Sequence, residues 1–418
     1  MTKSQNKTVI DMEPSGIRRF FDIANEIEGV ISLGVGEPDF PTPWSIREEA
    51  IRAIRKSKTY YTANAGLIEL RRAISKYVDR KYDLKYDPDT EVIVTVGGSE
   101  AIDLACRGLI NPGDEVLCMD PSYVSYTPSI ELAGGIPVPV KLPSEHDFIL
   151  QPENIEALIT DKTKAIILNY PNNPTGAAAT REELEKLADV IKKHDLYVLT
   201  DEIYSEIWYA KDKYTSIASF EGMKERTIYI NGFAKAFSMT GWRIGYLCGP
   251  EALVEQMLKI HQFTIMAAPT VSQYASVVAL EDCDDDVEAM RKDYLKRRNF
   301  LLGRFRDMGL PCFVPRGAFY TFPDIREFDM TSEEFALALL DAKKLAVVPG
   351  SAFGEGGEGF LRISYAYSIK ELTIAMNKIE EFVTELRNKK TKINSAYINA
   401  HSFSKNLCTQ RLRGKYHG

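Results

Sequence analysis

The stretch EVIVTVGGSEAIDLACRGL, residues 91–109, decides the fold class of this chain. It begins with an apolar run rich in β-branched residues, passes through two glycines, and continues with apolar residues at helical spacing. Similar apolar runs, DEVLCM, KAIILN, LYVLT and TIYIN, each lead into a polar loop. Uninterrupted apolar strands that alternate with helices are typical of a parallel sheet buried on both faces. We therefore predict an α/β fold in which helices cover a mostly parallel sheet.

Two domains are expected from the length of the chain and from a change of pattern along it. At 418 residues the chain exceeds the size at which one hydrophobic core stops growing. From about Met290 a long charged helical pattern precedes short strands around GAFYTF, LAVVPG and FLRISYA. We expect a large domain over residues 46–290 and a smaller α+β domain from residues 1–45 and 291–390. Residues 391–418 are basic, and we expect them to be poorly ordered.

Composition and charge disfavour several classes of function. Hydrophobic residues make up 44% and charged residues 27%, and the net charge of -7 gives no sign of nucleic-acid binding. The amino-terminal segment is polar, and no apolar run approaches the length of a membrane span. The six cysteines and five histidines show no metal-ligand spacing. We therefore expect a cytoplasmic protein without a metal site and without a nucleic-acid or membrane partner.

The loops after the predicted strands carry polar residues that could serve one ligand. In a doubly wound sheet the ligand lies beyond the carboxyl ends of the strands, so these loops should converge on one crevice. The motif GGSEA places Gly98 and Ser99 at a strand-to-helix junction, where N–H groups and the helix dipole attract an anion. Arg243 could pair with the same anion. Taken alone, a tight turn and a surface arginine explain these residues equally well.

Four other loop residues offer groups that suit a planar heteroaromatic ring. Asp201 ends an apolar strand, where a carboxylate is costly unless it meets a cation or a hydrogen-bond donor. Tyr123 offers a ring for stacking, Asn173 an amide and Tyr204 a phenol. Each also has an ordinary structural explanation as a loop, turn or core residue.

Lys235 lies among small residues in the stretch NGFAKAFSMTGWRIGY, residues 231–246. A lone lysine in a loop is usually solvated, and a solvated lysine needs no small neighbours. An anion site, a stacking ring, a carboxylate, two donors and one amine together suit pyridoxal 5'-phosphate, a phosphorylated heteroaromatic aldehyde. Lys235 would then be the Schiff-base lysine, which needs room for the cofactor and a lowered pKa.

From about Ser15 to Leu386 the sequence resembles the class I pyridoxal-phosphate-dependent aminotransferases of fold type I. The matching motifs, in order, are SLGVGEPDFPTP, YTANAGLIELRRAI, VGGSEA, DPSYVSY, NYPNNPTG, DEIYSE, NGFAKAFSMTGWRIGY, GAFY, VVPGSAFG and FLRISYA. Within the family, the chain is similar in particular to prokaryotic aspartate, aromatic and N-acetyl-diaminopimelate aminotransferases. The resemblance implies pyridoxal 5'-phosphate as the cofactor, a mostly parallel large domain and a smaller α+β domain.

The resemblance also implies roles for the residues around the cofactor ring. Lys235 would hold the cofactor and move a proton between the substrate's Cα and the cofactor. Asp201 would pair with the ring nitrogen, and Asn173 and Tyr204 would hydrogen-bond the ring oxygen. Tyr123 would stack on the ring.

The phosphate and the substrate would be held by a second group of residues. The phosphate ligands implied are Gly98, Ser99, Glu100 (through backbone or side chain), Arg243 and, from a neighbouring subunit, Tyr61. The active unit would therefore be a homodimer. Arg362 would bind the substrate's α-carboxylate, with Gly36 and Asn173 lining the same pocket. Many relatives carry serine at the position of Gly232, so one phosphate contact of the family is missing here unless a glycine N–H partly replaces it.

The implied activity is transfer of an amino group from an L-amino acid to a 2-oxo acid in a ping-pong mechanism. Glutamate and 2-oxoglutarate are the usual pair in the family. A C–S or β-lyase on the same fold is the alternative, and a non-enzymatic regulator is disfavoured because Lys235 is present. The amino donor stays open, since its side-chain pocket would be assembled from distant residues such as Ile17, Arg18, Tyr61 and Phe263.

Overall fold

A seven-stranded sheet forms the centre of the protein, with strand order β2-β8-β7-β6-β5-β3-β4. This computed structural model describes residues 5–12, 14, 16–17 and 27–413, and it describes side chains up to residue 391. Neighbouring strands are parallel except β8, which runs antiparallel to β2 and β7. The predicted α/β fold with a mostly parallel sheet is confirmed. The strands are β2 (Val92–Thr95), β3 (Glu115–Asp120), β4 (Ile136–Lys141), β5 (Thr163–Asn169), β6 (Tyr197–Asp201), β7 (Thr227–Gly232) and β8 (Gly245–Cys248).

Helices pack on both faces of this sheet. The described α-helices are α1 (Lys7–Asp11), α3 (Trp44–Arg55), α4 (Ile68–Tyr82), α5 (Gly97–Leu109), α6 (Tyr126–Leu132), α7 (Pro152–Glu156), α8 (Arg181–Lys193), α9 (Glu251–Thr264), α10 (Thr270–Asp282), α11 (Asp284–Asp307), α12 (Ser332–Lys343) and α13 (Ile369–Arg413). Ile167 and Leu199 belong to a buried cluster with α5 and α9, whereas their strand neighbours Ile166 and Val198 pack with α8. Alternate residues of one strand are therefore buried on opposite faces, which explains the uninterrupted apolar runs.

Local sequence signals set the starts of the helices. Thr180 caps α8, because its hydroxyl accepts the N–H of Glu183 and the carboxylate of Glu183 accepts the N–H of Thr180. This reciprocal capping box satisfies N–H groups at the start of the helix. Helix α5 begins at Gly97. Its first turn therefore includes both glycines of the motif GGSEA.

In the described part of the chain, two small sheets lie together with helices α11, α12 and α13. Strands β9 (Tyr320–Thr321), β11 (Val348–Pro349) and β12 (Leu361–Ser364) make an antiparallel sheet, and β1 (Ile31–Ser32) pairs in parallel with β10 (Leu345–Ala346). The short strands expected around GAFYTF, LAVVPG and FLRISYA are therefore present. Helix α11 starts at Asp284, earlier than the change of pattern near Met290. The predicted domain boundaries at residues 46 and 290 stay a prediction.

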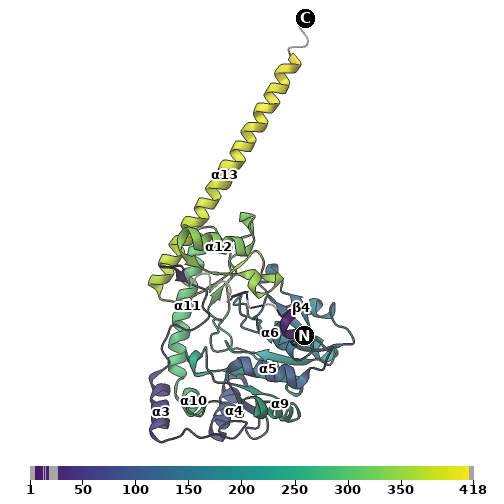
Figure 1. The fold of residues 1–418 in the computed structure, drawn as a ribbon, viewed down its shortest axis with the longest axis vertical. Coiled ribbons are helices and arrows are strands. Elements are labelled where there is room, and N and C mark those ends of the chain that lie inside the picture. Colours follow the sequence, from purple (N-terminus) through teal and green to yellow (C-terminus); the bar gives the residue numbers. More distant parts are fainter. Residues whose placement is uncertain (1–4, 13, 15, 18–26, 414–418) are drawn as a thin grey trace.

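The last helix, α13, runs from Ile369 to Arg413 and projects from the rest of the protein (Figure 1). Near its beginning Phe382 packs against Phe335 of α12, with ring centroids 5.2 Å apart. The helix includes residues 391–413 of the basic segment. The expected poor order of residues 391–418 stays a prediction.

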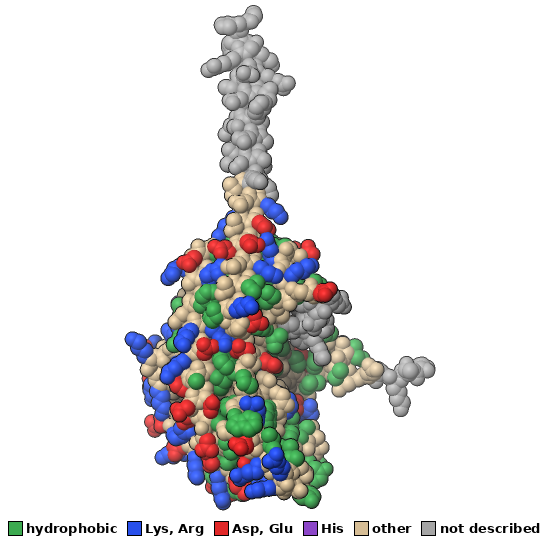
Figure 2. Space-filling model, turned by 90° about the vertical axis from the view of Figure 1, so that its left-hand side faces the viewer, with side chains coloured by type: hydrophobic (Ala, Val, Ile, Leu, Met, Phe, Trp, Pro, Cys, Tyr) green, Lys and Arg blue, Asp and Glu red, His purple; other side chains and the backbone are tan. Residues whose placement is uncertain are grey.

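The surface agrees with the modest net charge of the sequence. Acidic and basic side chains are interspersed over the face shown in Figure 2, with small groups of hydrophobic side chains between them. Among the helices of the described residues, none is long and apolar enough to cross a membrane. The cytoplasmic location stays a prediction.

Candidate functional site

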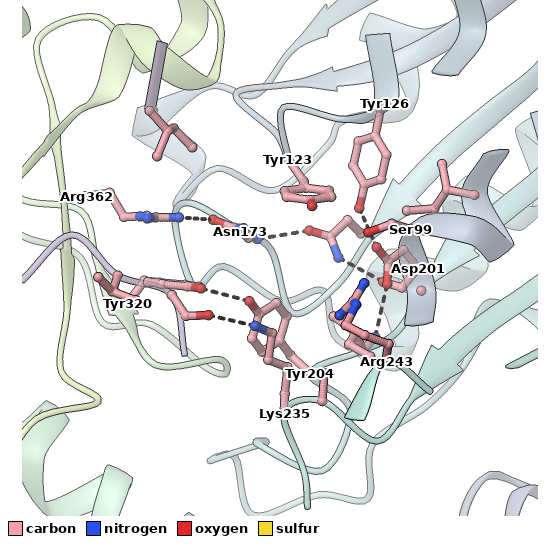
Figure 3. A pocket seen from close by; sticks show the side chains of 18 residues that line it. Ser99, Tyr123, Tyr126, Asn173, Asp201, Tyr204, Lys235, Arg243, Tyr320 and Arg362 are labelled. Carbon is pink, nitrogen blue, oxygen red and sulfur yellow. Dashed lines mark hydrogen bonds between the residues drawn. The ribbon is translucent and has the colours of Figure 1, made fainter. Parts of the chain in front are cut away.

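A cavity of about 350 Å³ lies at the carboxyl ends of the parallel strands. Loops that follow β2, β3, β5, β6 and β7 line it together with Tyr320 and Arg362 from the smaller antiparallel sheet. These loops converge, as the sequence analysis predicted, and Figure 3 shows their side chains directed toward a common space. The predicted site residues that line the cavity are Gly36, Gly98, Ser99, Tyr123, Asn173, Asp201, Tyr204, Lys235, Arg243 and Arg362.

Asp201 presents a carboxylate in fixed orientation at the end of β6. One of its oxygens accepts a hydrogen bond from the Tyr126 hydroxyl at 2.8 Å, and the other accepts the Ile203 N–H at 3.2 Å. Asn169 ends the neighbouring strand in register with Asp201 and donates to its carbonyl oxygen at 2.9 Å. Burial raises the pKa of Asp201 to about 6, and the hydrogen bond from Tyr126 opposes this rise. A cationic donor in the cavity would favour the charged carboxylate.

Lys235 follows β7 and extends into the cavity (Figure 3). Its Nζ donates to the carbonyl oxygen of Gly36 at 2.6 Å. Burial lowers the pKa of Lys235 to about 8, and the positive charge of Arg362 adds to this effect. The neutral amine is the nucleophilic form. At pH 7 a much larger fraction of this side chain is therefore reactive than of an exposed lysine.

Arg362 brings a buried cation to the opposite end of the cavity. The residue is 3% exposed, and its guanidinium donates to Asn173 Oδ1 at 2.9 Å and to the carbonyl oxygen of Gly34 at 2.5 Å. The rings of Tyr320 and Phe353 each lie 4.7 Å from its central carbon. Its Nε has no hydrogen-bond partner in the described part of the chain. A buried guanidinium with an unpaired N–H is suited to binding a carboxylate.

The aromatic side chains of the cavity hold one another in place. The hydroxyl groups of Tyr204 and Tyr320 are 2.8 Å apart, and Tyr123 packs edge-on against Tyr126 with ring centroids 5.6 Å apart. A side chain at Gly36 would collide with the Tyr320 hydroxyl. The phenols are therefore fixed between the large sheet and the smaller one, and the backbone at Gly36 can approach them only because it lacks a Cβ.

The first turn of α5 lies beside the guanidinium of Arg243. Gly97 has a φ of +74°, and a Cβ added to it would lie 2.8 Å from Nη2 of Arg243. A Cβ added to Gly98 would meet no atom within 4 Å, so the space beside this residue is open. Nη1 of Arg243 donates to the carbonyl oxygen of Thr240 at 3.1 Å. Backbone N–H groups at a helix start and a guanidinium nearby are the usual groups that hold phosphate.

Two of the predicted cofactor ligands, Glu100 and Tyr61, do not line the cavity. The Glu100 carboxylate accepts the N–H of Val96 and pairs with Nδ1 of His261 at 2.7 Å. The alternative in which its side chain contacts the phosphate is therefore wrong, which leaves its backbone. Tyr61 is 85% exposed and lies outside the cavity of its own chain. Its predicted contact with a neighbouring subunit stays a prediction.

Gly232 stands where many relatives carry serine. Its N–H donates to Asn231 Oδ1 at 2.7 Å, and its effect on the phosphate contact stays open. Of the residues considered for the side-chain pocket, Ile17 lines the cavity and Phe263 is 87% exposed. Arg18 lies outside the described residues.

Three polar residues of the cavity, Tyr126, Asn169 and Tyr320, were not predicted, although each carries a signal in the sequence. Tyr126, the partner of Asp201, comes one helical turn after Tyr123 in DPSYVSY. Asn169 ends its apolar strand as Asp201 ends the next one. Tyr320 occurs in the motif GAFY, whose aromatic residue has no assigned role in the sequence analysis.

Residues 28–379 match the family model described as aminotransferase class I and II. The chain belongs to this family. A Bacillus subtilis (strain 168) relative of this aminotransferase, named "Putative aminotransferase YugH", is 49% identical over 92% of this chain and 99% of its own length. Aromatic-amino-acid aminotransferase 2 of Thermococcus litoralis is 44% identical over 90% of this chain and 97% of its own. The crystal structure of Pyrococcus protein-A1 superposes with a TM-score of 0.89 at 43% identity, covering 91% of this chain and 98% of that chain.

These findings confirm the resemblance, because other matching relatives are named aspartate and N-acetyl-LL-diaminopimelate aminotransferases. Class I aminotransferases use pyridoxal phosphate, and the cavity fits this cofactor. It holds an amine with a lowered pKa at Lys235 and a buried carboxylate at Asp201. It also has open space beside Gly98 and a guanidinium from Arg243 next to it.

Proposed function

We propose that this aminotransferase passes an amino group from an L-amino acid to a 2-oxo acid in ping-pong order, with glutamate and 2-oxoglutarate as one pair. The observation that carries the proposal is that Lys235, which follows β7 of the large sheet, and Arg362, in β12 of the smaller sheet, line the same cavity. An amine that is neutral near physiological pH and a cation for a carboxylate are the two groups needed to act on any α-amino acid.

Residues at the carboxyl ends of the strands would hold the cofactor. When bound, pyridoxal phosphate supplies an electron sink and stores the amino group between the two half-reactions. Asp201, oriented by Tyr126, would accept a hydrogen bond from the ring nitrogen, and its negative charge would keep that nitrogen protonated. Tyr204 and Asn173 are the candidate donors to the ring oxygen. Gly98, Ser99 and Arg243 would hold the phosphate.

Lys235 and Arg362 would act on the substrate. Arg362 would bind the α-carboxylate, while its bonds to Asn173 and Gly34 fix the plane of the guanidinium. This orients the bound amino acid with its Cα toward the lysine. Nζ of Lys235 would hold the cofactor in the resting enzyme and, once free, would take the proton from the substrate's Cα and deliver it to the cofactor. The pKa of about 8 suits both steps at neutral pH.

Exposed aromatic residues support the proposal of a homodimer. Tyr60 is 79% exposed, Tyr61 85% and Phe263 87%. Their segments lie side by side, because the Thr270 hydroxyl donates to the Tyr60 carbonyl oxygen at 2.6 Å and the Asn64 amide donates to the carbonyl oxygen of Met266 at 2.9 Å. A contiguous exposed apolar patch commonly marks a protein interface. In a dimer, Tyr61 would contribute to the cavity of the partner.

The ping-pong order is tested by presenting the cofactor-loaded enzyme with single amino acids in the absence of a 2-oxo acid. A donor should release one equivalent of its own 2-oxo acid per active site and remove the visible absorbance of the bound cofactor. Addition of 2-oxoglutarate should then restore the absorbance and form one equivalent of glutamate. Release of oxo acid only after the acceptor is added would contradict the ping-pong order. Continued formation of ammonia and pyruvate without an acceptor would favour the β-lyase alternative.

A further inference from the structure

A buried pair of ionisable side chains, Glu100 and His261, lies behind the first turn of α5. Glu100 Oε1 and His261 Nδ1 are 2.7 Å apart, and the side chains are 10% and 0% exposed. The other carboxylate oxygen of Glu100 accepts the N–H of Val96, the residue before the helix. None of these three residues lines the cavity. The pair has no part in the reaction as proposed above, yet it is attached to the turn that carries Gly98 and Ser99.

Hydrogen bonding indicates which nitrogen of His261 carries the proton. Nε2 is buried and has no partner within the described residues, whereas Nδ1 faces the Glu100 carboxylate. A buried N–H without an acceptor is costly, and a carboxylate accepts but cannot donate. The arrangement therefore favours a ring whose Nδ1–H donates to Glu100.

Helix α9 is a rigid support for this donor. A Cβ added to Gly108 of α5 would lie 2.7 Å from Cγ of Met257 on α9, so the two helices are in close contact. Met257 is fully buried, and His261 follows it by one helical turn on the same face. The hydrogen bond from His261 thus connects the beginning of α5 to a tightly packed neighbouring helix.

The Glu100 carboxylate is also the negative charge nearest in sequence to the anion site. An unpaired buried carboxylate beside a phosphate would repel it, and a carboxylate that left Val96 would release the turn at the start of α5. The His261 donor keeps Glu100 in place on the side of α5 away from the cavity.

We propose that His261 is a positioning residue for the phosphate end of the cofactor site. Through Glu100 it holds the first turn of α5 so that the N–H groups at Gly98 and Ser99 stay directed toward the phosphate. This inference rests on the proposed function, because it takes the cavity at α5 and Arg243 as the phosphate site.

The test compares two amide variants that differ in where the donor sits. In His261→Asn the side-chain amide replaces Nδ1 and can reach Glu100, whereas in His261→Gln it replaces Nε2 and cannot. The dissociation constants of pyridoxal 5'-phosphate and of pyridoxal, which lacks the phosphate, are measured for the apo form of each full-length protein. Thermal unfolding of both variants is recorded alongside.

His261→Gln should weaken binding of pyridoxal 5'-phosphate about tenfold, comparable to the loss of one hydrogen bond to a charged group, and leave pyridoxal binding within about twofold. His261→Asn should keep both constants within about twofold of the original protein. Equal weakening of both ligands by His261→Gln, or equal loss in the two variants, would overturn the proposal, because either result indicates a general structural role.

Arg243→Gln separates a failure of this inference from a failure of the proposed site. If Arg243→Gln weakens pyridoxal 5'-phosphate selectively and His261→Gln does not, the role of His261 is rejected and the phosphate site stands. If neither variant changes the preference for the phosphorylated ligand, the phosphate site itself is misplaced and the inference falls with it.

Discussion

The two ends of the cavity present positive charge in opposite ways. At the end formed by the smaller sheet, Arg362 is 3% exposed, lies between two aromatic rings and makes two fixed hydrogen bonds. At the end formed by α5, Arg243 is exposed, and its backbone lies in the left-handed region with a φ of +51°. The other groups proposed to bind the phosphate at that end are the backbone N–H groups at Gly98 and Ser99.

The difference indicates how strongly each end depends on one side chain. A buried guanidinium can concentrate its interaction on one carboxylate, because water does not compete with it. An exposed guanidinium beside several N–H groups shares its ligand with them and is screened by solvent. We therefore expect the substrate end to depend on a single residue and the phosphate end to tolerate the loss of one.

Lys235 lies between the two ends, and its removal should have the largest effect. Lys235→Ala should lower turnover at least about 1,000-fold, because the proton-transfer group is lost while both ends remain. The cofactor should still bind, since Gly98, Ser99 and Arg243 are unchanged. Steady-state rates and equilibrium dialysis of the cofactor measure the two effects, with Lys186→Ala on the surface of α8 as the control. Retained turnover would remove Lys235 from the mechanism.

Arg362→Gln should raise the KM for the amino donor about 100-fold, as expected when one member of a buried, hydrogen-bonded charge pair is lost. Cofactor affinity should stay within about twofold. Arg362→Lys keeps the charge but not the planar fork of the guanidinium, so its KM should lie between those of the original protein and of Arg362→Gln. Initial-rate kinetics at saturating cofactor decide the outcome. An unchanged KM in Arg362→Gln would show that the α-carboxylate binds elsewhere.

Arg243→Gln should have a smaller effect, and at the other end. We expect the dissociation constant of pyridoxal 5'-phosphate to rise about tenfold, because the backbone donors of α5 remain. The KM for the amino donor at saturating cofactor should not change. If the cofactor dissociation constant of this variant rose by as large a factor as the KM of Arg362→Gln, the proposed contrast between the two ends would be wrong.

Tyr126→Phe should change kcat/KM least of these variants at alkaline pH, and it should lower kcat/KM more at acid pH. Burial raises the pKa of Asp201 to about 6, and the Tyr126 hydroxyl opposes the rise. Without that donor the pKa of Asp201 rises further. The reaction needs the carboxylate, so activity is lost as pH falls through this pKa, and the loss should begin at higher pH in the variant. The acid limb of the pH profile of kcat/KM measures this; an unshifted or lowered limb would contradict it.

The sequence predicts the large sheet and the phosphate end better than the contacts between distant segments. Apolar strands followed by polar loops identify Gly98, Asp201 and Lys235, because parallel strands bring such loops together at one edge. The antiparallel strand β8 has no comparable local signal, since it is as apolar as its parallel neighbours. Local patterns therefore predict which loops meet and leave the direction of individual strands open.

Long-range partners depend on tertiary packing that one sequence does not encode in a local pattern. Arg362 donates to Gly34, which is 328 positions away, and Glu100 pairs with His261, which is 161 positions away. The acidic residue of GGSEA was expected to face the anion with its neighbours. One residue step turns the side chain by about 100° around the helix, and that of Glu100 reaches His261 of α9. The predicted role of Tyr61 involves a second copy of the chain, so the contacts within one chain do not test it.

The identity of the lysine that holds the cofactor tests the central claim most directly. The full-length enzyme loaded with pyridoxal 5'-phosphate is reduced with borohydride, digested, and its lysine-containing peptides are mapped by mass spectrometry. We expect the reduced cofactor on Lys235 with about one equivalent per chain, because the site has a single nucleophilic lysine. A label on a different lysine, or no label on a fully loaded enzyme, would contradict it.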